Sequence, residues 1–247
     1  MSVAIITGAS SGIGASLARE LGRRKWKVGV IARRADLLDA IVAEVRAAGG
    51  EASAATADVT DRAALDGAVL ALEAVLGPCD LMVANAGSGQ PVPMHKLPVD
   101  SILATMRLNF DGALFSAASV LPGMLERKRG HVAVVSSVAA NRGLPGNGGY
   151  SASKAAVSTL WETMRVDLQG HGVRCTTIHP GFVATPLTSK NRFKMPFLLT
   201  ADQAACIVAD GLERGAKDIT FPWQMRWVTT LMRWLPIWAW DRMAPKR

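Results

Sequence analysis

Short runs of β-branched and other apolar residues alternate with longer segments of helical periodicity along most of this chain. The short runs cover residues 3–7, 28–31, 81–84, 132–136, 173–178 and 218–221. The helical segments cover residues 15–24, 37–48, 63–76, 102–127 and 152–168. This alternation is typical of βαβ units and predicts an α/β fold with a doubly wound parallel sheet. No linker, repeat or low-complexity segment divides the chain, so we expect a single domain.

The composition fits a protein that is folded throughout. Apolar residues make up 49% of the 247 residues and charged residues 19%, which supplies an ample core. The net charge of +8 comes from scattered Lys and Arg residues, without the basic helix or aromatic-interleaved basic stripe of nucleic-acid-binding proteins. We therefore expect no nucleic-acid partner. An anionic cofactor and an anionic membrane surface would each suit such a charge.

The cysteines, the histidines and the amino terminus indicate a reducing compartment and no metal. Cys79, Cys175 and Cys206 are widely spaced and odd in number, so we expect buried thiols rather than disulfides. The four histidines show no metal-ligand spacing. The first residues lack a secretory signal, and no apolar run reaches the about 18 residues that a spanning helix needs. The expected location is cytoplasmic.

A glycine-rich turn follows the first predicted strand and leads directly into a helix. Its sequence is Thr7-Gly8-Ala9-Ser10-Ser11-Gly12-Ile13-Gly14. Such a turn surrounds a ligand with backbone N–H groups at the positive end of a helix, and its glycines permit positive φ and close approach of a phosphate. The motif predicts the pyrophosphate-binding turn of a Rossmann-type fold, with an ordinary glycine-rich turn as the alternative.

The end of the second predicted strand indicates which nicotinamide cofactor the turn would serve. NAD-preferring sites usually place an Asp or Glu there for the ribose 2′-OH. This chain has Arg33 and Arg34 instead, and guanidinium groups form forked, charge-assisted bonds to phosphate. We interpret Asp36 as a helix cap rather than a ribose ligand. The pattern favours NADP(H) over NAD, unless the two arginines are simply a solvated surface pair.

Tyr150 and Lys154 are spaced i, i+4 and would share one helix face. A free phenol has a pKa of about 10, and a neighbouring ammonium group favours the phenolate and moves the pKa toward the range useful for acid–base catalysis. Tyr150 is also the one tyrosine of the chain. Alone the YxxxK pattern is weak, because the two residue types often share a helix face by chance.

Six motifs in the same order give the chain a resemblance to the short-chain dehydrogenase/reductase family over residues 2–222. That family has a TGxxxGxG turn, NAG after the fourth strand, Asn in the next helix, Ser ending the fifth strand, YxxxK, and PG. The corresponding residues here are Thr7 to Gly14, Asn85-Ala86-Gly87, Asn109, Ser137, Tyr150 with Lys154, and Pro180-Gly181.

The resemblance implies a catalytic role for four residues. Tyr150 would act as general acid in reduction and as general base in oxidation, and Ser137 would donate a hydrogen bond to the substrate oxygen. Ser137 is preferred to Ser136 because it lies thirteen residues before Tyr150, the usual spacing of the family. Lys154 would bind the nicotinamide ribose and lower the Tyr150 pKa. Asn109 would hold a water that links Lys154 to solvent, or serve only as a structural amide in a kinked helix.

The resemblance also implies cofactor contacts around NADP(H). Successive motifs along the chain would contact the phosphates, the 2′-phosphate, adenine, the riboses and the carboxamide of the cofactor. Asp58 could cap the next helix instead of contacting adenine. The expected cofactor-binding residues are Gly8, Ser10, Ser11, Gly12, Ile13, Gly14, Arg33, Asp58, Val59, Asn85, Ala86, Gly87, Tyr150, Lys154, Pro180, Val183 and Thr185. A homo-oligomer, either a dimer or a tetramer, is the corresponding expectation for assembly.

We expect residues 1–222 to form the NADP(H)-binding and catalytic part of the domain, and residues 223–247 to be a tryptophan-rich carboxyl-terminal extension of the same domain. Five of the seven tryptophans lie there, and Trp223, Trp227, Leu231, Trp234 and Trp238 fall at helical spacing on one face, with Arg226 and Arg233 on another. Pro236 should interrupt the helix. We expect this stripe to pack on the protein's own core or a partner subunit; peripheral membrane contact and a lid over the substrate are the alternatives.

Together these observations predict an NADP(H)-dependent oxidoreductase that interconverts a carbonyl compound and an alcohol. Phe193, Met195, Phe197 and Leu198 suggest an apolar ketone or aldehyde as the substrate. Two alternatives are an NAD-dependent alcohol dehydrogenase and a sensor or scaffold that binds NADP(H) without turnover. The sensor would have no need of a complete set of Asn, Ser, Tyr and Lys.

Overall fold

The computed structural model describes residues 2–189 and 194–244 and contains a seven-stranded parallel sheet with the strand order β3-β2-β1-β4-β5-β6-β9. The strands are β1 (Val3–Thr7), β2 (Lys27–Ala32), β3 (Glu51–Thr56), β4 (Leu81–Ala84), β5 (Gly130–Val135), β6 (Val173–Pro180) and β9 (Asp218–Phe221), and β7 (Val183–Ala184) pairs separately with β8 (Leu199–Thr200). The doubly wound, Rossmann-type sheet of a single domain is therefore confirmed.

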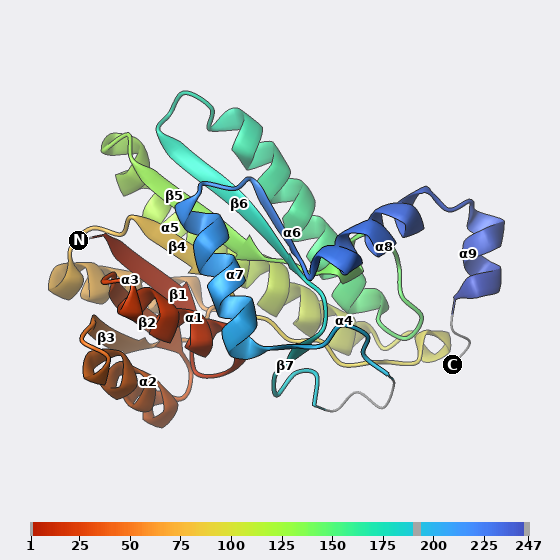
Figure 1. Cartoon of the computed structure of the whole chain (residues 1–247), viewed down its shortest axis with the longest axis horizontal. Coiled ribbons are helices and arrows are strands. Elements are labelled where there is room, and N and C mark those ends of the chain that lie inside the picture. Colours follow the sequence, from red (N-terminus) through yellow and green to blue (C-terminus); the bar gives the residue numbers. More distant parts are fainter. Residues whose placement is uncertain (1, 190–193, 245–247) are drawn as a thin grey trace.

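Helices cover both faces of the sheet (Figure 1). Side chains of α1, α2 and α7 form one buried layer, and those of α3, α5 and α6 form the other. The helices are α1 (Gly12–Arg23), α2 (Ala35–Ala47), α3 (Arg62–Leu76), α4 (Val99–Met106), α5 (Gly112–Glu126), α6 (Gly148–Asp167), α7 (Ala201–Glu213), α8 (Trp223–Trp234) and α9 (Ile237–Met243), with short helical turns η1 (Met94–Lys96), η2 (Arg107–Asp111) and η3 (Val138–Ala140). Strands β1, β4 and β5 are buried along their whole length because both faces are covered.

Three local expectations need correction. The predicted helix over residues 102–127 is instead α4, the π-helical turn η2 and α5 in succession. Cys206 is exposed on α7, because the buried side of that helix passes through Ala204, Ala205 and Val208; Cys79 and Cys175 are buried as expected. Asp36 lies in the first turn of α2 rather than at its cap, which is Arg34, so its charge meets the positive helix end without capping it.

The tail differs most from expectation. Pro236 separates α8 from α9, as predicted. The aromatic stripe does not pack on the protein's own core, however: Trp223, Trp227 and Trp234 are at least 68% exposed. The other side of α8 provides the packing, through Met225 and Thr229. Figure 1 shows α8 and α9 extending away from the sheet. No helix within the described residues is both long and apolar enough to cross a membrane.

Candidate active site

A cavity of about 620 Å³ lies at the carboxyl-terminal edge of the sheet. Parallel strands bring the residues that follow them to one edge, so segments far apart in the sequence meet there. Nearly all the predicted site residues line this cavity, namely Gly8, Ser10, Ser11, Gly12, Ile13, Arg33, Asp58, Val59, Asn85, Ala86, Gly87, Ser137, Tyr150, Lys154, Pro180, Val183 and Thr185. Gly14 and Asn109 do not line the cavity, and both contact residues that do or that adjoin them.

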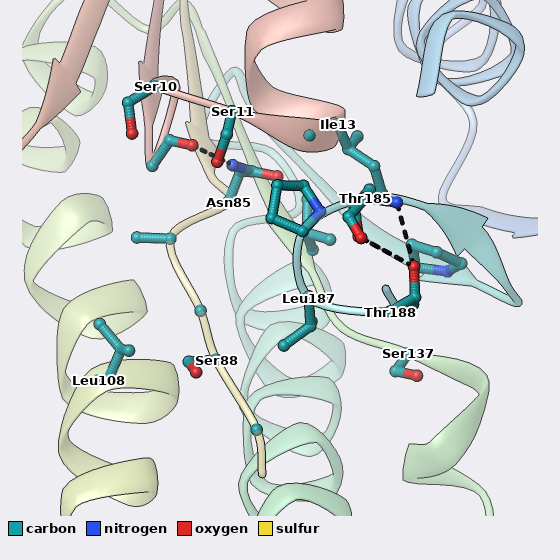
Figure 2. Close-up of a pocket in the computed structure, with 18 of the residues that line it drawn as sticks. Ser10, Ser11, Ile13, Asn85, Ser88, Leu108, Ser137, Thr185, Leu187 and Thr188 are labelled. Atoms are coloured by element: carbon teal, nitrogen blue, oxygen red, sulfur yellow. Dashed lines mark hydrogen bonds between the residues drawn. The ribbon is translucent and has the colours of Figure 1, made fainter. Parts of the chain in front are cut away.

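The glycine-rich turn between β1 and α1 is held against the end of β4 by Asn85. The Asn85 amide donates to the carbonyl oxygens of Thr7 (2.9 Å) and Gly8 (3.2 Å), and the Thr7 hydroxyl accepts from the Asn85 backbone N–H (3.2 Å). Figure 2 shows Ser11 beside Asn85, with Ile13 farther along, at the start of α1. The turn is therefore a rigid rim of the cavity.

Glycine is required at two positions of this turn. Gly8 has a φ of +66°, and a Cβ there would lie 2.6 Å from the Cα of Ala86. A Cβ on Gly14 would lie 2.4 Å from the Asn85 amide nitrogen. Gly14 therefore makes room for the amide that fixes the turn, which explains its place in the motif although it does not line the cavity.

Two arginines stand at the end of the cavity beyond β2. Arg34 donates to the hydroxyl oxygens of Ser10 (2.8 Å) and Ser11 (3.3 Å), and the guanidinium of Arg33 lies 3.5 Å from the Asp58 carboxylate. Both arginines are exposed and line the cavity. This end of the cavity thus combines two guanidinium groups with two serine hydroxyls, a donor set suited to an anionic group.

Asp58 does not cap the helix that follows it. That role belongs to Asp61, whose carboxylate accepts from the Ala64 N–H (3.1 Å) at the start of α3. Asp58 instead accepts hydrogen bonds from the backbone N–H (3.0 Å) and the hydroxyl (2.8 Å) of Thr60. The Thr60 N–H is the main cause that lowers the Asp58 pKa, with the nearby Arg33 adding to it. The carboxylate is therefore ionised and already bonded on one side.

Ser137, Tyr150 and Lys154 meet at the other end of the cavity. Ser137 lies between β5 and the short turn η3. Tyr150 is the third residue of α6, and Lys154 lies one turn later on that helix. The Lys154 ammonium group is buried, donates to the Val135 carbonyl oxygen (2.7 Å) and lies 5.9 Å from the centre of the Tyr150 ring. A hydroxyl, a phenol and an ammonium group thus share one wall.

The electrostatics of this wall differ from expectation in one respect. Burial raises the pKa of Tyr150, and its hydrogen bond with Ser137 only partly opposes that rise, whereas a lowered pKa was expected from Lys154. Burial lowers the pKa of Lys154 to about 8. Both groups are therefore biased toward their neutral forms by removal from water, because each charged form loses hydration there.

Of the two adjacent serines, Ser136 is engaged with α6. Its hydroxyl donates to the Lys154 carbonyl oxygen (2.9 Å) and lies 2.7 Å from the Ser158 hydroxyl. The Ser137 hydroxyl accepts from the Ala139 N–H (3.1 Å) and bonds Tyr150. Ser137 is therefore the serine whose hydroxyl is directed at the phenol.

Asn109 lies in the π-helical turn η2 and is fully buried. Its amide oxygen accepts from the Ser88 N–H (2.8 Å), while its amide nitrogen donates to the Ser88 carbonyl oxygen (2.8 Å) and the Ser153 hydroxyl (2.9 Å). Ser153 in turn donates to the Tyr150 carbonyl oxygen (2.8 Å). Asn109 therefore ties the loop after β4 to the first turns of α6.

Several lining residues were missed by the motifs. Leu108 and Leu187 give the cavity apolar surface, and Thr188 holds the loop after β7 by accepting from the Thr185 N–H (3.0 Å; Figure 2). The segment Ser88–Pro91 and the residue Pro186 also line it. Leu108 and Leu187 carry no chemical pattern, so no sequence signal marks them.

Three of the four residues expected to mark an apolar substrate do not line the cavity. Phe197 and Leu198 are about half exposed and lie outside it, as does Met195. Phe193 falls outside the described residues. Apolar surface is supplied instead by Leu108 and Leu187. Within residues 2–189 and 194–244, no group of three His, Cys, Asp or Glu side chains is arranged to hold a metal ion.

Comparison with known proteins agrees with this architecture. The sequence model of the short chain dehydrogenases matches residues 2–195. An uncharacterized oxidoreductase of Myxococcus xanthus is 44% identical over 94% of this chain and 92% of its own length. An alcohol dehydrogenase of Thermococcus sibiricus, complexed with 5-hydroxy-NADP, is similar in structure with a TM-score of 0.81 at 27% identity, covering 90% of this chain and 96% of that one.

A second solved structure supports the fold alone. A short chain dehydrogenase/reductase of Burkholderia phymatum, in complex with NAD, gives a TM-score of 0.86 at 24% identity, covering 93% of this chain and 92% of that one. One neighbour therefore carries an NADP derivative and the other NAD, so the choice of cofactor must be argued from the residues of this chain.

Proposed function

The chain belongs to the short-chain dehydrogenase/reductase family, and we propose that it transfers a hydride between NADP(H) and a carbonyl or alcohol substrate. The observation that carries the proposal is that Ser137, Tyr150 and Lys154 line the same cavity as the glycine-rich turn. Acid–base chemistry and dinucleotide binding would thus be served by a single site. The Leu108 and Leu187 side chains favour an apolar ketone or aldehyde.

The residues present fit a nicotinamide dinucleotide. Gly12 has a φ of +59° and opens the start of α1, where backbone N–H groups would meet the phosphates. The buried Lys154 ammonium group uses one of its three protons on Val135, so two remain for ribose hydroxyls. A bound nicotinamide would supply or accept the hydride.

The roles of the four expected catalytic residues follow from their positions. Tyr150 would give a proton to the substrate oxygen in reduction and take one in oxidation. Ser137 would donate a hydrogen bond to the same oxygen and hold it beside the phenol. Lys154, once bonded to a ribose, would be charged and would favour the phenolate. Asn109 supports this arrangement through Ser153 and the loop at Ser88, which favours positioning over a direct catalytic contact.

The preference for NADP(H) rests on Arg33 and Arg34. No carboxylate stands directly at the end of β2, where Arg33 and Arg34 lie, and Arg34 already binds the two serine hydroxyls at that end of the cavity. A 2′-phosphate could replace Asp58 as the partner of Arg33, because it carries more charge and accepts bidentate bonds. The runner-up, an NAD-dependent alcohol dehydrogenase, would leave both guanidinium groups without a phosphate. The family resemblance also predicts a homo-oligomer and a cytoplasmic location, and both stay predictions.

The experiment that tests the cofactor is a side-by-side titration with NADPH and NADH, followed by nicotinamide fluorescence. We expect Arg33→Ala to weaken NADPH binding about 10- to 100-fold, the equivalent of a lost charged hydrogen bond, and to leave NADH binding unchanged. Arg129→Ala is the matched control, because Arg129 is exposed beside β5 at the opposite edge of the sheet. Equal affinity of the wild type for both nucleotides would reject the NADP(H) assignment.

A second variant separates an enzyme from a sensor. Tyr150→Phe keeps the ring and removes the hydroxyl, so NADPH should still bind while reduction of a panel of aliphatic and aromatic ketones and aldehydes is lost. Wild-type protein that binds NADPH tightly and reduces no member of the panel would favour the alternative, a sensor or scaffold without turnover.

A further inference from the structure

The tail carries large apolar side chains on α8 and α9 that the core does not cover. We call these side chains together the tail face. It consists of Trp223, Trp227, Leu231 and Trp234 on α8 and Ile237, Trp238 and Met243 on α9, and each of these side chains is between 68% and 80% exposed. Exposed patches of this kind on a folded protein mark interaction sites, because leaving so much apolar surface in water is costly.

The tail face points away from the protein. Residues 223, 227, 231 and 234 follow the spacing of a single helix stripe. Met225 and Thr229 lie on the opposite side of α8 and are buried, and a Cβ on Gly181 would lie 3.0 Å from Met225 Cγ. The helix therefore docks through one side and keeps its aromatic side free.

The tail is fixed in this orientation by Arg142. Its guanidinium donates to the carbonyl oxygens of Met232 (3.2 Å) and Leu235 (2.9 Å) at the end of α8, and it lies 5.2 Å from the centre of the Trp240 ring on α9. The last carbonyls of a helix have no partner within it, so Arg142 satisfies groups that would otherwise favour fraying. The exposure of the tail face is thus a feature of the folded tail.

The charge of the tail selects among the surfaces that could cover it. Residues 222–244 contain Arg226, Arg233 and Arg242 but a single acidic residue, Asp241. The whole chain carries +8, so a second copy would bring the same excess of positive charge. An anionic lipid surface complements it, and tryptophan beside arginine is the composition of helices that lie in a bilayer interface.

We propose that the tail face inserts into the interfacial region of a membrane that contains anionic phospholipid. α8 has 12 residues and is about 18 Å long, well short of the roughly 30 Å hydrocarbon core, so it would lie in the plane of the interface. Its start follows β9 directly, at the edge of the sheet where the cavity lies. Binding requires neither NADP(H) nor turnover, so its test is independent of the proposed function.

The test is sedimentation of the full chain with two kinds of vesicle, phosphatidylcholine alone and phosphatidylcholine mixed with phosphatidylserine. We expect binding to the mixed vesicles, with a blue shift of tryptophan emission, and at least tenfold weaker binding for the double variant Trp227→Gln, Leu231→Gln. The matched control is Leu70→Gln, Val75→Gln, because both side chains are about as exposed on α3. Its binding should equal that of the wild type.

The charge contribution is tested by Arg226→Gln, Arg233→Gln, which should bind the mixed vesicles at least tenfold more weakly and with less dependence on salt. Wild-type protein that stays in the supernatant with both kinds of vesicle overturns the proposal. A second outcome would also overturn it: the wild type self-associates in solution, the Trp227→Gln, Leu231→Gln variant does not, and neither binds vesicles. The tail face would then be covered by a second copy of the chain. Unchanged binding of the Trp227, Leu231 variant would also overturn it.

Discussion

Gly89 sets the space available to the Tyr150 ring. A Cβ at this position would lie 2.4 Å from Tyr150 Cδ2 and 2.8 Å from Cγ, so Gly89→Ala must displace the ring or the loop. Misplacement by about 1 Å can cost 100-fold in rate. We predict that Gly89→Ala lowers kcat at least about tenfold and changes the NADPH dissociation constant far less, measured by steady-state kinetics and fluorescence titration. Gly143→Ala is the control, because a Cβ there meets no atom within 4 Å; an unaltered kcat for Gly89→Ala would contradict the prediction.

At this scale the sequence predicts residue identities better than residue environments. The glycine-rich turn and the Tyr150–Lys154 spacing are local patterns, and most of the residues they named line one cavity, with Gly14 just behind it. The direction of the Tyr150 pKa was predicted wrongly, because burial depends on strands and loops brought together by the fold. The bond between Arg34 and Ser10 was missed for the same reason, since 24 positions separate the two residues.

The π-helical turn η2 joins two helices that the sequence predicts as one. Asn109 in this turn satisfies the N–H and the carbonyl of Ser88, and both would lose their partner in Asn109→Ala. Unpaired buried polar groups cost about 1–3 kcal/mol each. We predict that the variant loses about 2–4 kcal/mol of unfolding free energy in urea titrations. Asn147→Ala is the control because its side chain makes no cap bond to α6; equal stability of the two variants would refute a supporting role for Asn109.

Elements with a strong pattern were predicted and elements without one were missed. The apolar, β-branched strands β1 and β4 were predicted with the bounds the structure shows. Strand β3 is composed mainly of Ala, Ser and Glu at the sheet edge, where Ala52 is its one buried residue and all six of its residues are in register with β2. Its propensity for a strand is low, so pairing with β2 rather than local sequence determines its structure.

At the scale of the whole molecule, the chain combines a sheet that helices cover on both faces with a tail whose aromatic face is uncovered. Helical spacing predicts that Trp223 and Trp227 share a side, but it does not say whether that side faces inward. The answer depends on Met225 and Thr229, which are the buried residues of α8, with Met225 packed close to Gly181 after β6. The sequence therefore predicts the stripe, and the tertiary structure shows its direction.

The stability of the whole molecule should depend on pH through His131, which is buried in β5. Its Nε2 lies 2.7 Å from the Thr176 hydroxyl, which itself donates to the Ala216 carbonyl oxygen, so the imidazole N–H is the donor between them. Burial, aided by the positive charge of Arg174, lowers the His131 pKa from 6.5 to about 3. Between pH 6.5 and about pH 3 the unfolded chain binds a proton at His131 that the folded protein excludes. The unfolding free energy therefore falls as pH falls, by at most about 1.4 kcal/mol per pH unit.

Urea titrations at pH 7 and pH 5.5 measure this effect, since both values lie above the range where most carboxylates titrate. We predict that the wild type loses about 1–2 kcal/mol between them and that His131→Gln, which keeps an N–H donor for Thr176, loses much less. His171→Gln removes an exposed imidazole and is the matched control. If His131→Gln and His171→Gln show the same loss, then the proton excluded from the folded state does not belong to His131, and the buried imidazole is not the source of the acid sensitivity.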